Sequence, residues 1–159
     1  MQPASPRIVE LFNEALTFEL TVTNTYFLHA KMLENWGLGR LASAFRAYSI
    51  DEMKDADELI ERILLFDGLP NVQRLNAITV GETPEEMLAL ALESEKLAVQ
   101  TFNASAKECH DLGDHGSASV FEAMVLDEER HADWFEGQLD AMQRVGLQNY
   151  LAQQIHTDG

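Results

Sequence analysis

The chain has 159 residues, of which 27 are acidic and 11 are basic, so its formal net charge at pH 7 is −16. This acidic balance argues against a general binder of nucleic-acid backbones, which needs a basic face. Apolar residues make up 46%, and the chain has only nine glycines and four prolines, which argues against intrinsic disorder and against a turn-rich all-β domain.

The sequence shows no sign of export, of a disulfide framework or of a membrane span. Its single cysteine, Cys109, excludes an intramolecular disulfide. The first residues, Met1-Gln2-Pro3-Ala4-Ser5-Pro6, lack the basic region and apolar core of a signal peptide. No apolar run approaches the length of about 20 residues that a membrane helix needs. We therefore expect a soluble, cytoplasmic, single-domain protein over residues 1–159, with neither a membrane nor a nucleic acid as partner.

Long helical segments occupy most of the chain. Ser5-Pro6 supplies a cap and a first-turn proline to the first segment, and Thr83-Pro84-Glu85-Glu86 forms a capping box at the start of the third. Breaks that contain glycine separate the segments. Between the breaks, apolar residues recur every three or four positions. This spacing predicts four helices and a short fifth one, over about 6–36, 40–67, 84–112, 115–145 and 147–156.

The connections between these helices predict how they are arranged. The first and second helices are joined by a short turn, as are the third and fourth, and short turns make antiparallel neighbours. The connection over residues 68–83 is long enough to run along the bundle from one end to the other. The expected fold class is therefore all-α. It is a ferritin-like antiparallel four-helix bundle (residues 6–145) with a long crossover between helices two and three and a short C-terminal fifth helix.

Each of the four long helices carries one glutamate near the middle of its apolar stripe, namely Glu19, Glu52, Glu95 and Glu128. A buried carboxylate without a partner costs several kcal/mol, and four that lie close together also repel one another. The basic residues on these stripes are too few to neutralise them. A divalent cation would do so, since oxygen ligands suit hard and borderline metals.

The spacing of these glutamates repeats between the two halves of the chain. Glu19 and Glu52 are 33 residues apart, and so are Glu95 and Glu128. Three positions after Glu128, on the same helix face, stands His131, and the matching position after Glu52 is Asp55. One Glu from each of two helices, with Glu-x-x-His from each of the other two, is the di-iron carboxylate pattern. One of its two histidines is therefore replaced by Asp55.

The chain around these residues resembles the bacterioferritin family over about residues 6–155. The resemblance rests on the stretches Tyr26-Phe27-Leu28-His29-Ala30, Asn35-Trp36-Gly37-Leu38, Ser49-Ile50-Asp51-Glu52-Met53-Lys54, Leu59-Ile60-Glu61-Arg62-Ile63-Leu64, Gly68-Leu69-Pro70-Asn71, His131-Ala132-Asp133-Trp134 and Gly146-Leu147-Gln148-Asn149-Tyr150-Leu151. It implies a cytoplasmic cage of twenty-four subunits that takes in Fe(II), oxidises it with O₂ or H₂O₂ and stores ferric mineral. It also implies haem b between paired subunits.

The resemblance also implies roles for individual residues. Glu52 and Glu128 match bridging ligands of a di-iron ferroxidase centre, and the terminal ligands match Glu19, Glu95 and His131. The family has a histidine where this chain has Asp55, so Asp55 is the expected ligand of the second iron. Met53 matches the methionine that ligates haem iron, and Tyr26 matches a tyrosine close to the centre, which could donate an electron or a hydrogen bond.

Three interpretations follow from these residues. In the first, the chain is a storage subunit with its own ferroxidase activity. In the second, Asp55 impairs the metal site, and the chain is a haem-carrying structural subunit that co-assembles with an active subunit. The third covers another di-iron helical oxidase, such as a rubrerythrin-like protein, or a plain scaffold. Outside the glutamates, Cys109-His110 with His115 is too small a set for a zinc site, and a solvated helix end is the expected reading.

Overall fold

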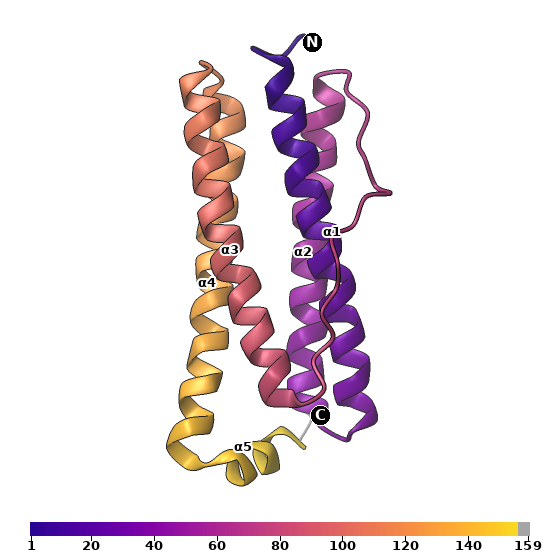
Figure 1. The fold of residues 1–159 in the computed structure, drawn as a ribbon, viewed down its shortest axis with the longest axis vertical. Helices are drawn as coiled ribbons and strands as arrows, with labels where there is room; N and C mark the ends of the chain where they lie inside the picture. The colour runs from indigo at the N-terminus through magenta and orange to yellow at the C-terminus, as the bar shows by residue number, and fades with distance from the viewer. Residues whose placement is uncertain (156–159) are drawn as a thin grey trace.

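The computed structural model describes residues 1–155 and consists of five helices joined by turns and one long connection (Figure 1). The helices are α1 (Pro6–Asn35), α2 (Gly39–Leu65), α3 (Pro84–Asp111), α4 (His115–Val145) and α5 (Leu147–Gln154). The all-α prediction is confirmed, and each predicted boundary within the described residues lies within two residues of the observed one. Residue 156, the predicted end of the fifth helix, lies outside the described residues.

The predicted caps begin α1 and α3. Ser5 Oγ accepts a hydrogen bond from the Arg7 N–H at 3.2 Å, and Thr83 Oγ1 accepts one from the Glu86 N–H at 3.1 Å. The return bond of the capping box differs from the standard one, because the Glu86 carboxylate accepts from the N–H of Glu82, at 3.3 Å, rather than from that of Thr83. Both helices therefore begin where the sequence places their polar caps.

The two short turns of the bundle have the same geometry. Gly37 follows α1 with φ +79°, and Gly113 follows α3 with φ +80°, a left-handed conformation that glycine adopts without steric cost. The next residue then donates its N–H back to a carbonyl of the last helical turn, Leu38 to Leu33 and Asp114 to Cys109, at 3.0 and 2.9 Å. This Schellman arrangement ends each helix and reverses the chain into an antiparallel partner.

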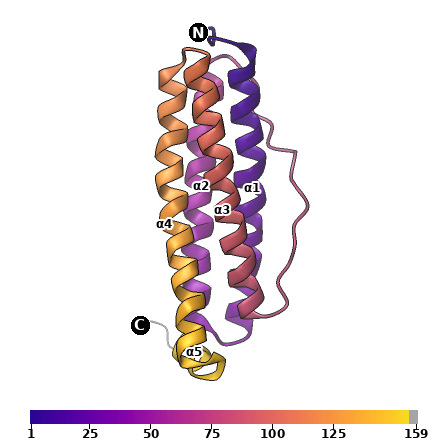
Figure 2. The same ribbon diagram turned by 60° about the vertical axis from the view of Figure 1, so that its left-hand side comes forward.

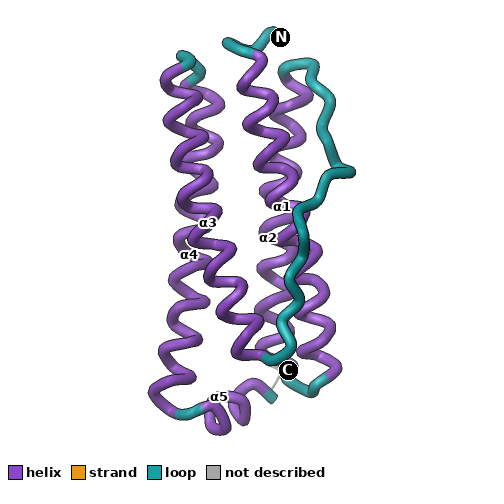
Figure 3. The backbone as a smooth tube through the Cα atoms, in the orientation of Figure 1, coloured by secondary structure: helices purple, strands orange, loops and turns teal. Residues whose placement is uncertain are grey.

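Two antiparallel hairpins, α1 with α2 and α3 with α4, pack together as the bundle (Figures 1 and 2). The connection between Leu65 and Pro84 runs along the outside of the bundle from one end to the other, as predicted (Figure 3). The short helix α5 lies across the end of the bundle opposite to the N-terminus (Figure 1). Among the described residues, no helix combines the length and the apolar character that crossing a membrane requires.

The crossover is held against α1 by its own backbone donors. The N–H groups of Asn71, Asn76 and Gly81 donate to Asn13 Oδ1, Thr21 Oγ1 and His29 Nε2, at 2.8, 2.9 and 3.0 Å. Burial lowers the pKa of His29 to about 4, so its imidazole is neutral and Nε2 acts as an acceptor. Side chains of α1 thereby accept hydrogen bonds from the backbone of a long segment that has no regular secondary structure.

The apolar stripes form two clusters, one toward each end of the bundle. The first contains Phe12, Phe102 and Phe121, with the Phe12 and Phe121 ring centroids 4.5 Å apart. The second contains Phe45 and Phe135, with their centroids 5.5 Å apart. Leu92, Val99 and Leu139 are half-buried and pack against these clusters. The two clusters leave a polar layer between them, which contains the four glutamates.

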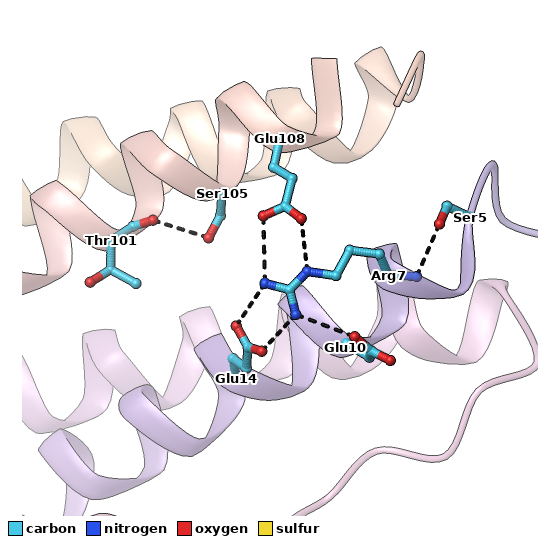
Figure 4. Close-up of polar contacts among 7 residues, drawn as sticks. All are labelled: Ser5, Arg7, Glu10, Glu14, Thr101, Ser105 and Glu108. Atoms are coloured by element: carbon cyan, nitrogen blue, oxygen red, sulfur yellow. Dashed lines mark hydrogen bonds and ion pairs between the residues drawn. The ribbon is translucent and has the colours of Figure 1, made fainter. Parts of the chain in front are cut away.

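An arginine joins the two hairpins near the N-terminal end of α1 (Figure 4). Arg7 Nε donates to Glu108 Oε1 on α3 at 2.8 Å, and its Nη1 donates to Glu14 at 2.8 Å and to Glu10 at 3.3 Å. The three carboxylates raise the pKa of the guanidinium. This network connects the start of α1 with the end of α3 across the bundle surface.

Candidate metal centre

The structure brings the four predicted glutamates together in the middle of the bundle. Glu19, Glu52, Glu95 and Glu128 come from α1, α2, α3 and α4, and none of them is more than 1% exposed. The helical period of each stripe turns these positions inward, and the 33-residue spacing sets the two members of each hairpin at matching levels. Four carboxylates that are far apart in the sequence therefore share one buried layer.

Together with Asp55 and His131, the glutamates form two overlapping groups of possible ligands. In each group, one ligand atom from every member lies within 4.8 Å of the others. The first group is Glu52, Glu95, Glu128 and His131, and the second is Glu19, Glu52, Asp55 and Glu128. Glu52 and Glu128 belong to both groups. The geometry therefore suits two cations side by side, with two carboxylates shared between them.

The half of the cluster that contains His131 is partly neutralised by its own residues. His131 Nδ1 lies 3.0 Å from Glu52 Oε1, 3.8 Å from Glu95 Oε1 and 3.9 Å from Glu128 Oε2. Burial alone would lower the pKa of His131, but its hydrogen bond to Glu52 and its contact with the Glu95 carboxylate raise it to about 10. The imidazole is therefore cationic at neutral pH and compensates one of the buried carboxylates while the site is without metal.

Glu95 is further stabilised by Tyr26, whose hydroxyl donates to Glu95 Oε1 at 2.5 Å. Burial raises the pKa of Glu95, but contacts with Glu128, His131 and Tyr26 outweigh it and lower the pKa below its ordinary value. Burial and the Glu95 charge raise the pKa of the Tyr26 phenol. Glu95 is therefore an ionised carboxylate, held in place by a tyrosine that stays protonated.

Glu19 and Asp55, which belong only to the other half, have no such partner within residues 1–155. Both carboxylate oxygens of Glu19 and of Glu128, with Glu52 Oε2 and Asp55 Oδ2, are buried without a hydrogen-bond partner in this part of the chain. Burial and repulsion from Glu52 raise the pKa of Glu19, and the same two causes raise that of Asp55 to about 7. Buried carboxylate oxygens are normally paired, so this arrangement is suited to a cation.

A surface cavity of about 240 Å³ reaches two members of this cluster, Asp55 and His131. It is lined by buried and exposed residues together, namely Asp51, Lys54, Asp55, Glu58, Asp127, Arg130 and His131. Lys54, Glu58 and Arg130 are exposed, whereas Asp55 and His131 are buried at its inner end. Carboxylates and two basic side chains therefore line this cavity together, and two members of the ligand groups form its inner end.

Two residues beside the cluster were not among the predicted site residues. Tyr48 packs its ring against His131, with the centroids 4.6 Å apart, and Asp51 Oδ2 lies 3.7 Å from His131 Nε2. A signal for both was present in the sequence, because they precede Glu52 and Asp55 by four residues and share their helix face. They restrict the orientation of the imidazole ring.

Met53, the predicted haem ligand, lies outside the buried cluster. Its side chain is 52% exposed, although it follows Glu52 directly in α2. Ile50, three residues earlier on the same face, is 41% exposed. An exposed thioether beside an apolar side chain fits the soft ligand and the apolar contact that a haem requires at a subunit surface.

Comparisons with known proteins agree over almost the whole chain. The family described as "Ferritin-like domain" matches residues 9–145. "Bacterioferritin" from Mycolicibacterium paratuberculosis is 43% identical over 148 residues, which cover 93% of each chain. "Bacterioferritin" from Streptomyces coelicolor is 44% identical over 147 residues, 92% of this chain and 88% of the relative. The solved structure of Mycobacterium tuberculosis bacterioferritin, BfrA, superposes with a TM-score of 0.95 at 42% identity and covers 98% of each chain.

Proposed function

Because this chain belongs to the bacterioferritin family, we propose that it is an iron-storage and detoxification subunit that oxidises Fe(II) to Fe(III) in its buried carboxylate cluster. Membership of this family also excludes the interpretation of the chain as a rubrerythrin-like oxidase. The observation that carries the proposal is the pair of ligand groups that share Glu52 and Glu128 and contain unpaired buried oxygens. Such a cluster is unfavourable when empty and becomes favourable when two divalent cations enter it.

In this proposal, the residues divide the work of holding two Fe(II) ions, which are the substrate. Glu52 and Glu128 bridge the two ions, and Glu95 and His131 complete one position while Glu19 and Asp55 complete the other. Each Fe(II) gives one electron, so two ions together, with two protons taken up from water, reduce one O₂ to H₂O₂ or one H₂O₂ to two waters. Tyr26 holds Glu95 in place through its hydrogen bond. The Fe(III) product then leaves for storage as mineral.

The surroundings of Asp55 bear on the two remaining interpretations of the chain, as a ferroxidase subunit or as a structural subunit. Its Oδ2 is buried without a hydrogen-bond partner among residues 1–155, and it belongs to one of the ligand groups. An aspartate that had merely lost the ligand position would turn toward solvent, where its charge is hydrated. These contacts support a subunit with its own ferroxidase activity. The alternative is a haem-carrying subunit with an impaired site, which requires an active partner subunit.

The deciding experiment is anaerobic loading of the purified protein with Fe(II), followed by rapid mixing with O₂ and measurement of ferric absorbance. We expect a fast phase that saturates at two irons per subunit. Oxidation no faster than in protein-free buffer would contradict ferroxidase activity and favour the structural-subunit alternative. Glu129→Gln is the matched control, because Glu129 is exposed, directly follows Glu128 and faces another direction.

The proposal includes haem b, bound between two copies of the chain by Met53 from each. A haem at that position would supply a one-electron carrier for reduction of stored iron. The exposed thioether and its apolar neighbour Ile50 support this assignment. Met53→Leu should abolish the visible absorbance of bound haem and leave the oligomer intact. Met142→Leu, a buried core substitution, should keep the haem, and loss of haem from both variants would argue against a specific role of Met53.

The proposed assembly is a cage of twenty-four subunits, either of this chain alone or with a second subunit type. Native mass spectrometry of the purified protein distinguishes a homopolymer from a mixed cage, and a monomer would contradict both. The cytoplasmic location stays a prediction.

A further inference from the structure

Outside the buried cluster, the turn between α3 and α4 brings two histidines into contact. His110 lies in the last turn of α3, and His115 is the first residue of α4. Their Nδ1 atoms are 2.9 Å apart, and their ring centroids are 5.0 Å apart. Two nitrogens that each lie about 2.0–2.1 Å from one metal ion are separated by about 2.9–3.4 Å. The pair is therefore spaced as two ligands of a single ion.

A carboxylate fixes which nitrogen of His110 faces its partner. Glu122 Oε1, on α4, lies 2.6 Å from His110 Nε2. In the tautomer in which Nε2 donates to this carboxylate, the lone pair is on Nδ1, the nitrogen that faces His115. Histidines that ligate metals commonly donate their second N–H to a carboxylate in this way, which orients the ring and makes it a stronger ligand.

The backbone that carries the two rings is held in place by several contacts. The Asp114 N–H donates to the Cys109 carbonyl at 2.9 Å, and the Asp114 carboxylate accepts from the Ser117 N–H at 2.9 Å. Arg62 of α2 forms an ion pair with Asp114 at 3.3 Å, in which both side chains are largely buried. Asp114 thus forms the contacts that hold together the turn carrying both histidines.

We propose that His110 and His115 form a surface site for a divalent transition-metal ion, with Glu122 orienting His110 and water filling the other positions. Two imidazole nitrogens favour borderline ions in the order Cu²⁺ above Ni²⁺ and Zn²⁺, and Fe²⁺ binds more weakly to the same ligands. His115 precedes Glu128 by 13 residues in α4, which is about 20 Å along a helix. The site is therefore separate from the carboxylate cluster and selects different ions.

Electron paramagnetic resonance with Cu²⁺ tests this site in the intact protein. We expect one Cu²⁺ per subunit with hyperfine splitting from two nitrogens, which persists when Glu52→Gln disables the buried cluster. His110→Gln and His115→Gln should each remove that signal and weaken binding by at least about 100-fold, and Glu122→Gln should weaken it about 10-fold. Fe(II) oxidation should be unchanged in all three surface variants.

Asp111→Asn is the matched control, because Asp111 is exposed in the same turn and pairs with Lys107 rather than with the histidines. Its copper signal should equal that of the unmodified chain. The proposal is overturned if His110→Gln and His115→Gln leave the two-nitrogen signal in place, or if all bound copper disappears with Glu52→Gln. Far-ultraviolet circular dichroism establishes that each variant remains helical, so a lost signal reports on ligands rather than on unfolding.

Discussion

The two halves of the buried cluster share Glu52 and Glu128 but differ in their charge balance. On one side His131 contacts three glutamates and neutralises part of their charge. On the other side Asp55 takes the corresponding position and adds a carboxylate. A single residue three positions after a glutamate thus decides whether that half balances its own charge or depends on a cation. The difference predicts unequal affinities of the two positions for iron.

The largest expected effect comes from removing a residue that both halves use. Glu52→Gln removes one of the two bridging carboxylates from both proposed irons, so Fe(II) binding and oxidation should fall by more than about 100-fold. Anaerobic Fe(II) titration with stopped-flow oxidation measures both quantities. A variant that retained one tightly bound iron would contradict the proposal that Glu52 serves both positions.

Exchanging Asp55 and His131 tests whether these two residues cause the difference in iron affinity between the two halves. Asp55→His should give two similar positions and lower the Fe(II) affinity of the Asp55 half about 10-fold, because it removes a carboxylate that only a cation would compensate, whereas His131→Asp should raise the affinity of the other half to a similar degree. Calorimetric titration with Fe(II) under nitrogen resolves the two binding steps. Equal Fe(II) affinities of the two positions in the unmodified chain would contradict the proposed difference between the two halves.

In the metal-free protein, the two halves should lose stability in different pH ranges. Asp55 has its pKa raised to about 7 from an ordinary value of 3.8, so its contribution to the free energy of unfolding is complete below about pH 4 and is lost as the pH rises through 7. His131 has its pKa raised to about 10 from 6.5, so its contribution is complete below pH 6.5 and is lost as the pH rises through 10.

Thermal unfolding of chelator-treated protein between pH 4 and 10 tests this difference. At pH 8, Asp55→Asn should raise the Tm by about 5 °C, and at pH 4 it should leave the Tm nearly unchanged. A lower Tm of Asp55→Asn at pH 8 would show instead that Asp55 is stabilised as a carboxylate in the folded state.

The smallest expected effect comes from the surface network of Arg7. This network lies outside the metal cluster, so its variant serves as a reference for the variants of the two halves. Arg7→Ala removes the connection between α1 and Glu108 of α3, but these charges are largely exposed. The free energy of unfolding should fall by about 1 kcal/mol, as measured by urea denaturation, and both iron affinities should be unchanged. A changed iron affinity would mean that the surface network transmits strain to the buried layer.

Much of this architecture followed from local patterns in the sequence. The three- and four-residue period of apolar positions predicted the helices, Ser5 and Thr83 marked two of their starts, and the long connection predicted the crossover. The repeated 33-residue spacing indicated that Glu19 pairs with Glu52, and Glu95 with Glu128. These features depend on helical geometry and short turns, both of which are encoded by neighbouring residues.

The tertiary structure decided what depends on the packing of the two hairpins against each other. Only that packing brings Glu52 and Glu128 into both ligand groups, directs the Tyr26 hydroxyl to Glu95 and buries Asp55 beside the glutamates. The contact between His110 and His115, both exposed at the expected solvated helix end, likewise depends on the turn at the left-handed Gly113. Sequence periodicity assigns a side chain to a face of its helix, whereas the distance between atoms on different helices is set by how those faces interlock.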